Sequence, residues 1–358
     1  MYFNNKPVKN ILIVASDKHI GDLVLSLSAI NKLKEHFNGK GFYVVIDSRY
    51  AEIIETIEGL DNVILYPRKL LQGKPFLKRL SIQSEFLRRL RNASADMAID
   101  LHGGVASSTM TFLSGAPLRI GRSTAKRPYF YNHKITLSKG KRKLESFMQI
   151  ASAVGVQGKL QFQRLNVPER RETSIRNILK NEGIKQKIPI VCIHPGSSVI
   201  YKKWTEEGFA EISDWLIAKG FQVVFVGGED DLNEITNIIS QMKYSPHNLG
   251  NKISLGELIA LFKVSSLFIG NDSGPMHLAD ATGAPVIALF GPAGEHRWGP
   301  RSEKSIVLRG EQPCEPCKRK ECQYEFKCIK TLSADDVKIA VERLIRYPDK
   351  VRMSDYTE

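Results

Sequence analysis

Short apolar runs alternate with helix-periodic segments along most of this 358-residue chain, and this alternation restricts the fold more than any other feature of the sequence. The runs that predict strands cover residues 10–15, 42–46, 63–65 and 97–101 in the first half, and 188–193, 223–226, 267–270 and 286–290 in the second. Strands that alternate with helices form parallel sheets through right-handed crossovers. The sequence therefore predicts an α/β protein with doubly wound parallel sheets.

The length of the chain predicts two domains, because one hydrophobic core rarely serves more than about 250–300 residues. A polar, charge-rich span at 168–187 separates the two sets of strands, and we expect it to contain the linker. We expect an N-terminal Rossmann-like domain over 1–170 and a C-terminal one over 171–332. A helix and tail over 333–358 complete the chain, with packing on the N-terminal domain as one option.

The net positive charge of the chain indicates which kinds of molecule it binds. A net charge of +14 favours nucleic acid, an anionic membrane surface or a phosphorylated substrate. No apolar run approaches the ~20 residues that span a bilayer. The apolar run at 11–15 is too short for a signal peptide and is followed by Asp17 and Lys18. We therefore expect a cytosolic protein.

One strand-to-helix turn carries an unusual set of side chains. The apolar run that ends at Gly270 is followed by Asn-Asp-Ser-Gly-Pro at 271–275 and by a short helix with His277. Asp272 or Ser273 is suited to cap this helix, and Gly274 lets backbone amides approach a ligand closely. Such a helix start is a phosphate site. The alternative is a well-capped helix with a satisfied core histidine.

Two further loops are expected at the same sheet edge. The loop at 194–204 carries Lys202 and Lys203, and Gly227-Gly228-Glu229 follows the strand at 223–226. Loops at the carboxyl ends of parallel strands line one crevice, so together they predict a nucleotide-sugar pocket. For the lysines alone, a solvated approach to the next helix is the alternative. That helix is predicted over 206–218, with Thr205 as its cap and Trp204 and Phe209 as a hydrophobic staple.

The first strand leads into a loop at 16–22 without the dinucleotide-binding glycine pattern. Asp22 stands at the start of the following helix, where a capping role is one interpretation. The other is catalytic, because a single ionised carboxylate at the carboxyl edge of a sheet is able to accept the proton of an attacking hydroxyl.

Taken in order, these motifs resemble glycosyltransferase family 9, the ADP-heptose:lipopolysaccharide heptosyltransferases. The matching pieces are Ile-Gly-Asp at 20–22, Asp-Leu-His-Gly-Gly at 100–104, His-Pro-Gly at 194–196 with Lys-Lys-Trp at 202–204, Gly-Gly-Glu at 227–229, Asn-Asp-Ser-Gly-Pro-Met-His at 271–277 and Gly-Pro at 291–292. The resemblance implies a GT-B fold, in which two Rossmann-like domains face an interdomain cleft.

The resemblance also implies roles for individual residues. Asp22 matches the general base, and Lys202 matches a catalytic residue that contacts the donor phosphate. The other donor-binding positions are Ser197, Ser198, Glu229, Asp272, Ser273, Gly274 and His277. The acceptor-binding positions are Asp100, His102 and Arg122.

The implied reaction transfers heptose, with inversion, from ADP-L-glycero-D-manno-heptose to the inner core of lipopolysaccharide. The chain contains no Asp-x-Asp sequence, so the usual ligand spacing for a metal-bridged diphosphate is missing. Amides at a helix start and a lysine stabilise the leaving ADP without a metal, and no cofactor is expected.

Basic residues concentrate in the first half of the chain. Residues 119–143 hold nine lysines and arginines and no acid, and 76–91 form a basic amphipathic pattern. This suits an anionic glycolipid at a membrane surface, and we expect a peripheral location on the inner face of the inner membrane. An ordinary solvated face is the alternative. No nucleic-acid-binding motif supports a nucleic-acid partner.

Four of the five cysteines are clustered. Cys314, Cys317, Cys322 and Cys328 favour a metal over disulfides in a reducing cytosol, with structural zinc, an iron–sulfur centre and free thiols left open. Similar cysteines occur in members that resemble heptosyltransferase II. Cys192 lies in an apolar strand and is expected in the core.

Three alternative functions stay open from the sequence. The first is a family member that transfers a different sugar. The second is a nucleotide-sugar-binding protein without transferase activity, and the third is a basic nucleic-acid-binding protein. The presence of both Asp22 and Lys202 argues against the second of these.

Overall fold

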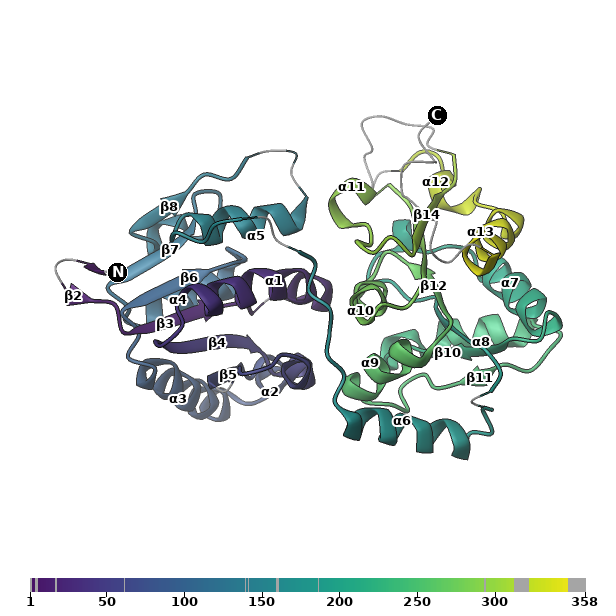
Figure 1. Cartoon of the computed structure of the whole chain (residues 1–358), viewed down its shortest axis with the longest axis horizontal. Helices are drawn as coiled ribbons and strands as arrows, with labels where there is room; N and C mark the ends of the chain where they lie inside the picture. The colour runs from purple at the N-terminus through teal and green to yellow at the C-terminus, as the bar shows by residue number, and fades with distance from the viewer. Residues whose placement is uncertain are drawn as a thin grey trace. The chain divides into compact units, whose positions relative to one another are not determined.

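The computed structural model describes residues 2–3, 6–16, 18–60, 62–138, 140, 142–158, 161–185, 187–292, 294–311 and 322–346. The chain divides into two compact units, Met1–Gln163 and Arg164–Glu358, and each is built on a six-stranded parallel sheet (Figure 1). This confirms the α/β class. The division falls between Gln163 and Arg164 rather than at the expected 170/171.

The sheet of the N-terminal unit has the order β5-β4-β3-β6-β7-β8. Its strands are β3 (Asn10–Val14), β4 (Gly41–Asp47), β5 (Asn62–Tyr66), β6 (Met97–Asp100), β7 (Leu118–Arg122) and β8 (His133–Ile135). The accompanying elements are β1 (Tyr2–Phe3), β2 (Lys6–Pro7), α1 (Ile20–His36), η1 (Ser48–Thr56), α2 (Arg68–Leu71), α3 (Phe76–Asn92), α4 (Val105–Leu113), η2 (Pro128–Phe130) and α5 (Lys143–Ser152). The central strands β3 and β6 are buried, as their continuous apolar runs require.

The sheet of the C-terminal unit has the order β11-β10-β9-β12-β13-β14. Its strands are β9 (Ile190–His194), β10 (Gln222–Phe225), β11 (His247–Asn248), β12 (Leu267–Asn271), β13 (Val286–Phe290) and β14 (Ser305–Arg309). The helices are α6 (Glu169–Asn181), η3 (Ile200–Lys202), α7 (Glu206–Ala218), η4 (Glu229–Asp231), α8 (Leu232–Gln241), α9 (Leu255–Val264), α10 (Gly274–Thr282), α11 (Glu295–Trp298), α12 (Lys327–Lys330) and α13 (Ala334–Arg346).

The start of α7 follows the local prediction. The Thr205 hydroxyl accepts a hydrogen bond from the Gly208 N–H at 3.1 Å, and the rings of Trp204 and Phe209 meet edge to face with centroids 4.9 Å apart. All the residues involved lie within five positions of one another. The sequence of this short segment is therefore enough to predict where the helix begins.

The charge-rich span at 168–187 was expected to contain the linker, and this expectation is wrong. Helix α6 occupies most of it and packs on α9, with Ile175 and Leu179 buried. The charged residues cover the rest of the helix surface, so the sequence of this segment looks like that of a polar linker. Two apolar residues one helical turn apart gave too weak a pattern to identify the buried side.

Helix α13 belongs to the core of the C-terminal unit. Val337, Ala340, Val341 and Leu344 are buried in the same cluster as the strands of that unit, and α13 packs on α7, β13 and β14. Helix α13 therefore packs within its own unit, and a further contact with the N-terminal domain stays a prediction. Residues 347–358, the tail of the prediction, lie outside the described residues.

Candidate functional site

Asp22 is the third residue of α1, which begins two residues earlier than expected. Its side chain lies where β3 passes into α1, at the carboxyl edge of the N-terminal sheet, and is 11% exposed. The carboxylate is ion-paired with Lys143, whose Nζ lies 2.8 Å from Asp22 Oδ1. Lys143 is the first residue of α5, a helix that packs on α1.

Lys143 is a site residue that sequence reasoning missed. It was grouped with the basic residues of 119–143 as a surface charge, but it is 7% exposed. Its Nζ also lies 5.3 Å from the centroid of the Phe147 ring. The sequence holds no local signal for this role, because the partner carboxylate lies far away in the chain.

Asp100, a predicted acceptor residue, is fully buried. Its Oδ1 accepts hydrogen bonds from the N–H groups of His102 at 2.8 Å and Gly103 at 2.9 Å, and its Oδ2 accepts one from the Tyr131 hydroxyl at 2.6 Å. Burial and the Asp100 carboxylate raise the pKa of Tyr131 well above its usual value. Asp100 therefore shapes the turn after β6, and its predicted role in acceptor binding stays a prediction.

The other two predicted acceptor residues lie beside this turn. Gly103 has a φ of +68°, and a Cβ there would lie 2.5 Å from Nε of Arg122, so a glycine is needed for the close approach. The Arg122 Nε is buried and has no hydrogen-bond partner among the described residues. The His102 ring packs edge to face on Phe147, the same ring that lies under Lys143. The structure thus brings Asp100, His102 and Arg122 together.

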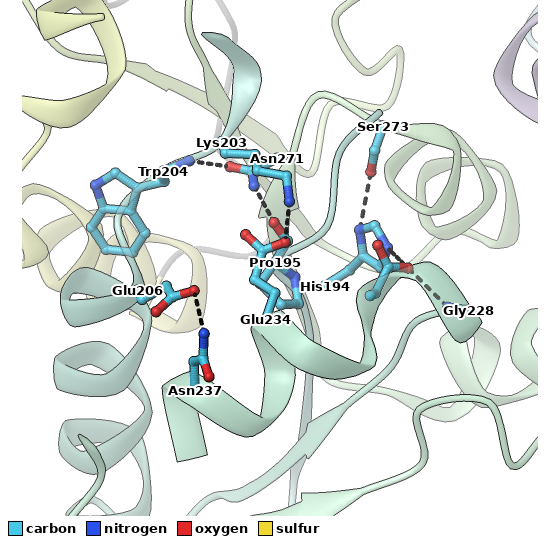
Figure 2. Close-up of polar contacts among 11 residues, drawn as sticks. His194, Pro195, Lys203, Trp204, Glu206, Gly228, Glu234, Asn237, Asn271 and Ser273 are labelled. Atoms are coloured by element: carbon cyan, nitrogen blue, oxygen red, sulfur yellow. Dashed lines mark hydrogen bonds and ion pairs between the residues drawn. The ribbon is translucent and has the colours of Figure 1, made fainter. Parts of the chain in front are cut away.

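In the C-terminal unit, three loops converge on His194, the last residue of β9 (Figure 2). Its Nδ1 lies 3.2 Å from the Ser273 hydroxyl, after β12, and its Nε2 lies 3.3 Å from Oδ2 of Asp231, after β10. Strands β10, β9 and β12 are neighbours in the sheet. The predicted convergence of the three loops is therefore observed.

Asp231 is a second residue that the sequence analysis passed over, although it lies two positions after Glu229. Its carboxylate accepts a hydrogen bond from the Gly228 N–H at 2.8 Å. A Cβ on Gly196 would lie 1.9 Å from Asp231 Oδ1, so the loop after β9 needs a glycine at this point. Burial raises the pKa of Asp231, but the hydrogen bonds and charges of its neighbours outweigh it and hold the pKa below its ordinary value.

Asn271 fixes the same loop from the other side. Its Oδ1 accepts a hydrogen bond from the Trp204 N–H at 3.1 Å, and its Nδ2 donates one to the Pro195 carbonyl (Figure 2). Lys203 is ion-paired with Glu234, with 2.5 Å between Nζ and Oε2. Both ends of the loop at 194–204 are thereby held by side chains of other elements.

Lys202 lies opposite the start of α10. Its Nζ is 2.6 Å from Oδ2 of Asp272, whose side chain is buried, while the Lys202 side chain is partly exposed. Lys202 and Asp272, which were both predicted to contact the donor, are therefore ion-paired with each other. This pair stands directly before Ser273, the residue that precedes α10.

The predicted cap of α10 is wrong in its detail. Ser273 is at the N-cap position, but its hydroxyl contacts His194 and makes no capping hydrogen bond, and Asp272 is engaged by Lys202. Pro275 is in the first turn as predicted. Because no side chain caps this helix, its first backbone N–H groups keep the anion-binding character of a helix start.

The remaining donor residues lie around this point. Gly274 is the first residue of α10 and half-buried, and His277 is buried one turn further on. Ser197 is half-buried, whereas Ser198 and Glu229 are exposed. Their predicted contacts with phosphate and sugar stay predictions.

Two of the four clustered cysteines fall on residues that are not described. Cys314 and Cys317 lie outside the described residues, whereas Cys322 is half-buried and Cys328 is buried. In the part of the chain that the structure describes, no group of three or more His, Cys, Asp or Glu side chains is arranged to hold a metal. Cys192 is buried as predicted, and burial raises the pKa of its thiol to about 12.

Among the described helices, none combines the length and the apolar character needed to cross a membrane.

Comparisons with known proteins identify the family of this chain. Residues 84–327, more than half of the chain, match glycosyltransferase family 9 (heptosyltransferase). Lipopolysaccharide heptosyltransferase 3 of Escherichia coli is 26% identical over 334 residues, which are 91% of this chain and 96% of that protein.

Two solved structures extend the likeness to the fold. The family 9 glycosyltransferase of Veillonella parvula has 25% identity and a TM-score of 0.84, with 95% of this chain and 98% of that chain covered. E. coli ADP-heptose lipopolysaccharide heptosyltransferase II has 20% identity and a TM-score of 0.79, with 95% and 99% covered. Its likeness shows the GT-B fold. The chain therefore belongs to glycosyltransferase family 9, the heptosyltransferase family.

Proposed function

We propose that this protein is an inverting glycosyltransferase that moves heptose from ADP-L-glycero-D-manno-heptose to the inner core of lipopolysaccharide. The observation that carries the proposal is the uncapped start of α10, with Lys202 beside it and the loops after β9 and β10 held against it through His194. The names of the relatives, which include lipopolysaccharide and ADP-heptose, support the choice of substrates.

The donor diphosphate is assigned to the C-terminal unit. Backbone N–H groups at a helix start and a lysine ammonium both favour an anion, and they stabilise the charge that develops on departing ADP. When the diphosphate arrives, it competes with Asp272 for Lys202. The exposed Glu229 is assigned to the ribose hydroxyls, and Ser197, Ser198 and His277 to the phosphates and sugar. No metal ion is needed for this step.

The acceptor is assigned to the N-terminal unit, with Asp22 as the general base. The Asp22 carboxylate takes the proton of the acceptor hydroxyl while the hydroxyl oxygen forms a bond to the anomeric carbon of heptose. The bond between that carbon and the diphosphate oxygen breaks at the opposite face, which inverts the configuration, and ADP leaves with the electron pair. Lys143 holds the carboxylate in place through its 2.8 Å contact.

The protein is assigned to the cytoplasmic face of the inner membrane. The basic helix α3 supports this location, since it carries Lys78, Arg79, Arg88, Arg89 and Arg91 and exposes Phe76 and Leu77. A helix with cationic and exposed apolar residues binds anionic lipid surfaces.

The test is to follow ADP release from ADP-heptose with lipopolysaccharide that lacks heptose, with and without a chelator. We expect release that depends on both substrates and is unchanged by the chelator. Release from another ADP-sugar in place of ADP-heptose would identify a different donor. ADP binding without release under any condition would identify a non-catalytic nucleotide-sugar-binding protein.

Lys202→Met and Lys203→Met form a matched pair of variants for the donor site. Both lysines are partly exposed and each has one carboxylate partner, but only Lys202 stands at the start of α10. Lys202→Met is expected to weaken ADP binding about tenfold, the usual scale for one charge-assisted contact of 1.5–3 kcal/mol. Calorimetry should show Lys203→Met within about twofold of the wild type. Equal losses in the two variants would contradict the assignment.

A further inference from the structure

A cavity of about 840 Å³ lies in the N-terminal unit and does not include Asp22 in its lining. Pockets for small ligands have volumes of about 300–1,000 Å³, so the size suits a sizeable molecule. The lining comes from the loop after β3, the end of β5, the start of α2, the turn after β6, and helices α3 and α4. Of the predicted acceptor residues, His102 lines the cavity, whereas Asp100 and Arg122 do not.

One part of the cavity is an apolar recess between α3 and α4, formed by Leu80, Leu87, Val105, Met110 and Leu113. Three of these side chains are unusually exposed for their type: Leu80 is 45%, Val105 50% and Leu113 36% exposed. The recess extends about 12 Å along α4, at a rise of 1.5 Å per residue. Exposed apolar side chains around a cavity are typical of a surface that an apolar ligand covers.

The other part is a cationic mouth at the carboxyl edge of the sheet, where Lys18 and Arg68 line the cavity. Arg68 shares the buried carboxylate of Asp47 with Arg49, which also donates to the Lys18 carbonyl at 3.1 Å. Two guanidinium groups against one carboxylate leave a net positive charge beside Lys18. None of the described residues that line the cavity is acidic.

We propose that this cavity binds an acyl chain of the anionic glycolipid acceptor, with the chain in the apolar recess and a phosphate or carboxylate of the head group at the cationic mouth. A free sugar would leave the recess uncovered, and a neutral lipid would leave the positive charge of the mouth unmatched. The identity of the lipid as the acceptor rests on the proposed function. The enzyme would then recognise the lipid part of its substrate as well as its sugar.

Ser84→Trp tests the recess with little risk to folding. Ser84 is exposed on α3 and lines the cavity, so an indole at this position fills space without entering the core. Ser81→Trp is the matched control, because Ser81 is exposed on the same helix and does not line the cavity.

The first measurement is calorimetric binding of myristoyl lysophosphatidic acid below its micelle concentration, without any transfer reaction. Glycerol phosphate and monomyristoylglycerol supply the head and the chain alone. We expect each of them, and the decanoyl homologue, to bind at least tenfold more weakly, since two buried methylenes change affinity roughly tenfold. Ser84→Trp should lose at least tenfold and Ser81→Trp should match the wild type. Equal binding of the complete lipid and its head, or equal behaviour of the two variants, overturns the proposal.

The second measurement compares lipopolysaccharide lacking heptose with its deacylated form as acceptors. We expect deacylation to raise KM at least tenfold in the wild type, and Ser84→Trp to raise KM for the acylated acceptor only. Transfer that is equally efficient with both acceptors would show that the acyl-chain site is wrong while the proposed function stands. Lipid binding without transfer to either acceptor would show that the proposed function is wrong while the acyl-chain site stands.

Discussion

The two units use one topology in different ways. In each six-stranded sheet the strand that comes first in the chain, β3 or β9, lies third in an order that is the same for both. At the carboxyl edge of the C-terminal sheet, hydrogen bonds of Asn271, His194 and Asp231 join neighbouring loops. At the same edge of the N-terminal sheet lie the ion pairs of Asp22 with Lys143 and of Asp47 with two arginines, the hydrogen bonds of Asp100, and a large cavity.

Under the proposed function, this difference shows how one scaffold is adapted to two ligands. A nucleotide diphosphate is small and charged, and a rigid network of loops preorganises amides for it. A glycolipid is large and partly apolar, and exposed side chains on helices provide contact area for it. The topology determines only where the ligands bind, and the side chains at the edge determine which ligands they are.

The largest effect is expected from Asp22→Asn, which tests whether the N-terminal unit supplies the catalytic base while the C-terminal unit alone binds ADP. Asp22→Asn keeps the shape of the side chain but removes the base, so kcat should fall by about 10²–10⁴. The Kd of ADP, measured by calorimetry, should stay at the wild-type value. A variant that turns over normally would remove Asp22 from the mechanism, and a variant that loses ADP binding would show that the two units are not separable in function.

A smaller loss of kcat is expected from Lys143→Met. Its removal leaves Asp22 without the 2.8 Å contact, and a misplacement of about 1 Å in a catalytic group costs up to about 10² in rate. We expect kcat to fall about 10–100-fold with KM for the acceptor little changed. Lys143→Arg, which restores the charge, should recover part of kcat. If the melting temperature falls in both variants and kcat follows it, Lys143 has only a structural role.

The smallest effect concerns the rigidity of the donor side. Asp231→Asn should destabilise the protein by about 1 kcal/mol at neutral pH, because one charge-assisted network contact is weakened. The pKa of Asp231 is lowered in the folded state, so its stabilisation is present above the unfolded pKa of about 3.9 and is lost as the pH falls through the folded value. Urea unfolding should therefore show a difference between variant and wild type that shrinks below about pH 4.

Asp230→Asn provides the control for this experiment, since Asp230 is exposed and adjacent in η4. It should unfold like the wild type at every pH. A difference between Asp231→Asn and the wild type that persists in acid would show that Asp231 acts through packing rather than charge.

The parts of the site that could be predicted are those that lie on a local pattern. The turn at 271–277 follows a buried strand and opens a helix with Pro275, and parallel topology brings it beside the loop after β9. The pairing within these loops could not be predicted. Lys202 was expected to be available to phosphate but contacts Asp272, and Ser273 contacts His194 instead of capping α10. Both contacts depend on where side chains that follow different strands meet.

The sequence by itself determined the parallel α/β class, the positions of eight of the twelve strands in the two sheets and the limits of α7, because each of these depends on apolar periodicity or on caps within a few residues. It missed the strands β7, β8, β11 and β14, which lie toward the edges of the sheets. Only the tertiary structure decided that 168–187 is a helix packed on α9, that Lys143 is buried beside Asp22, and that an apolar cavity opens between α3 and α4. These features join residues far apart in the chain. Whether a charged or apolar side chain faces water, a partner or a cavity is decided by those distant neighbours, which no local pattern encodes.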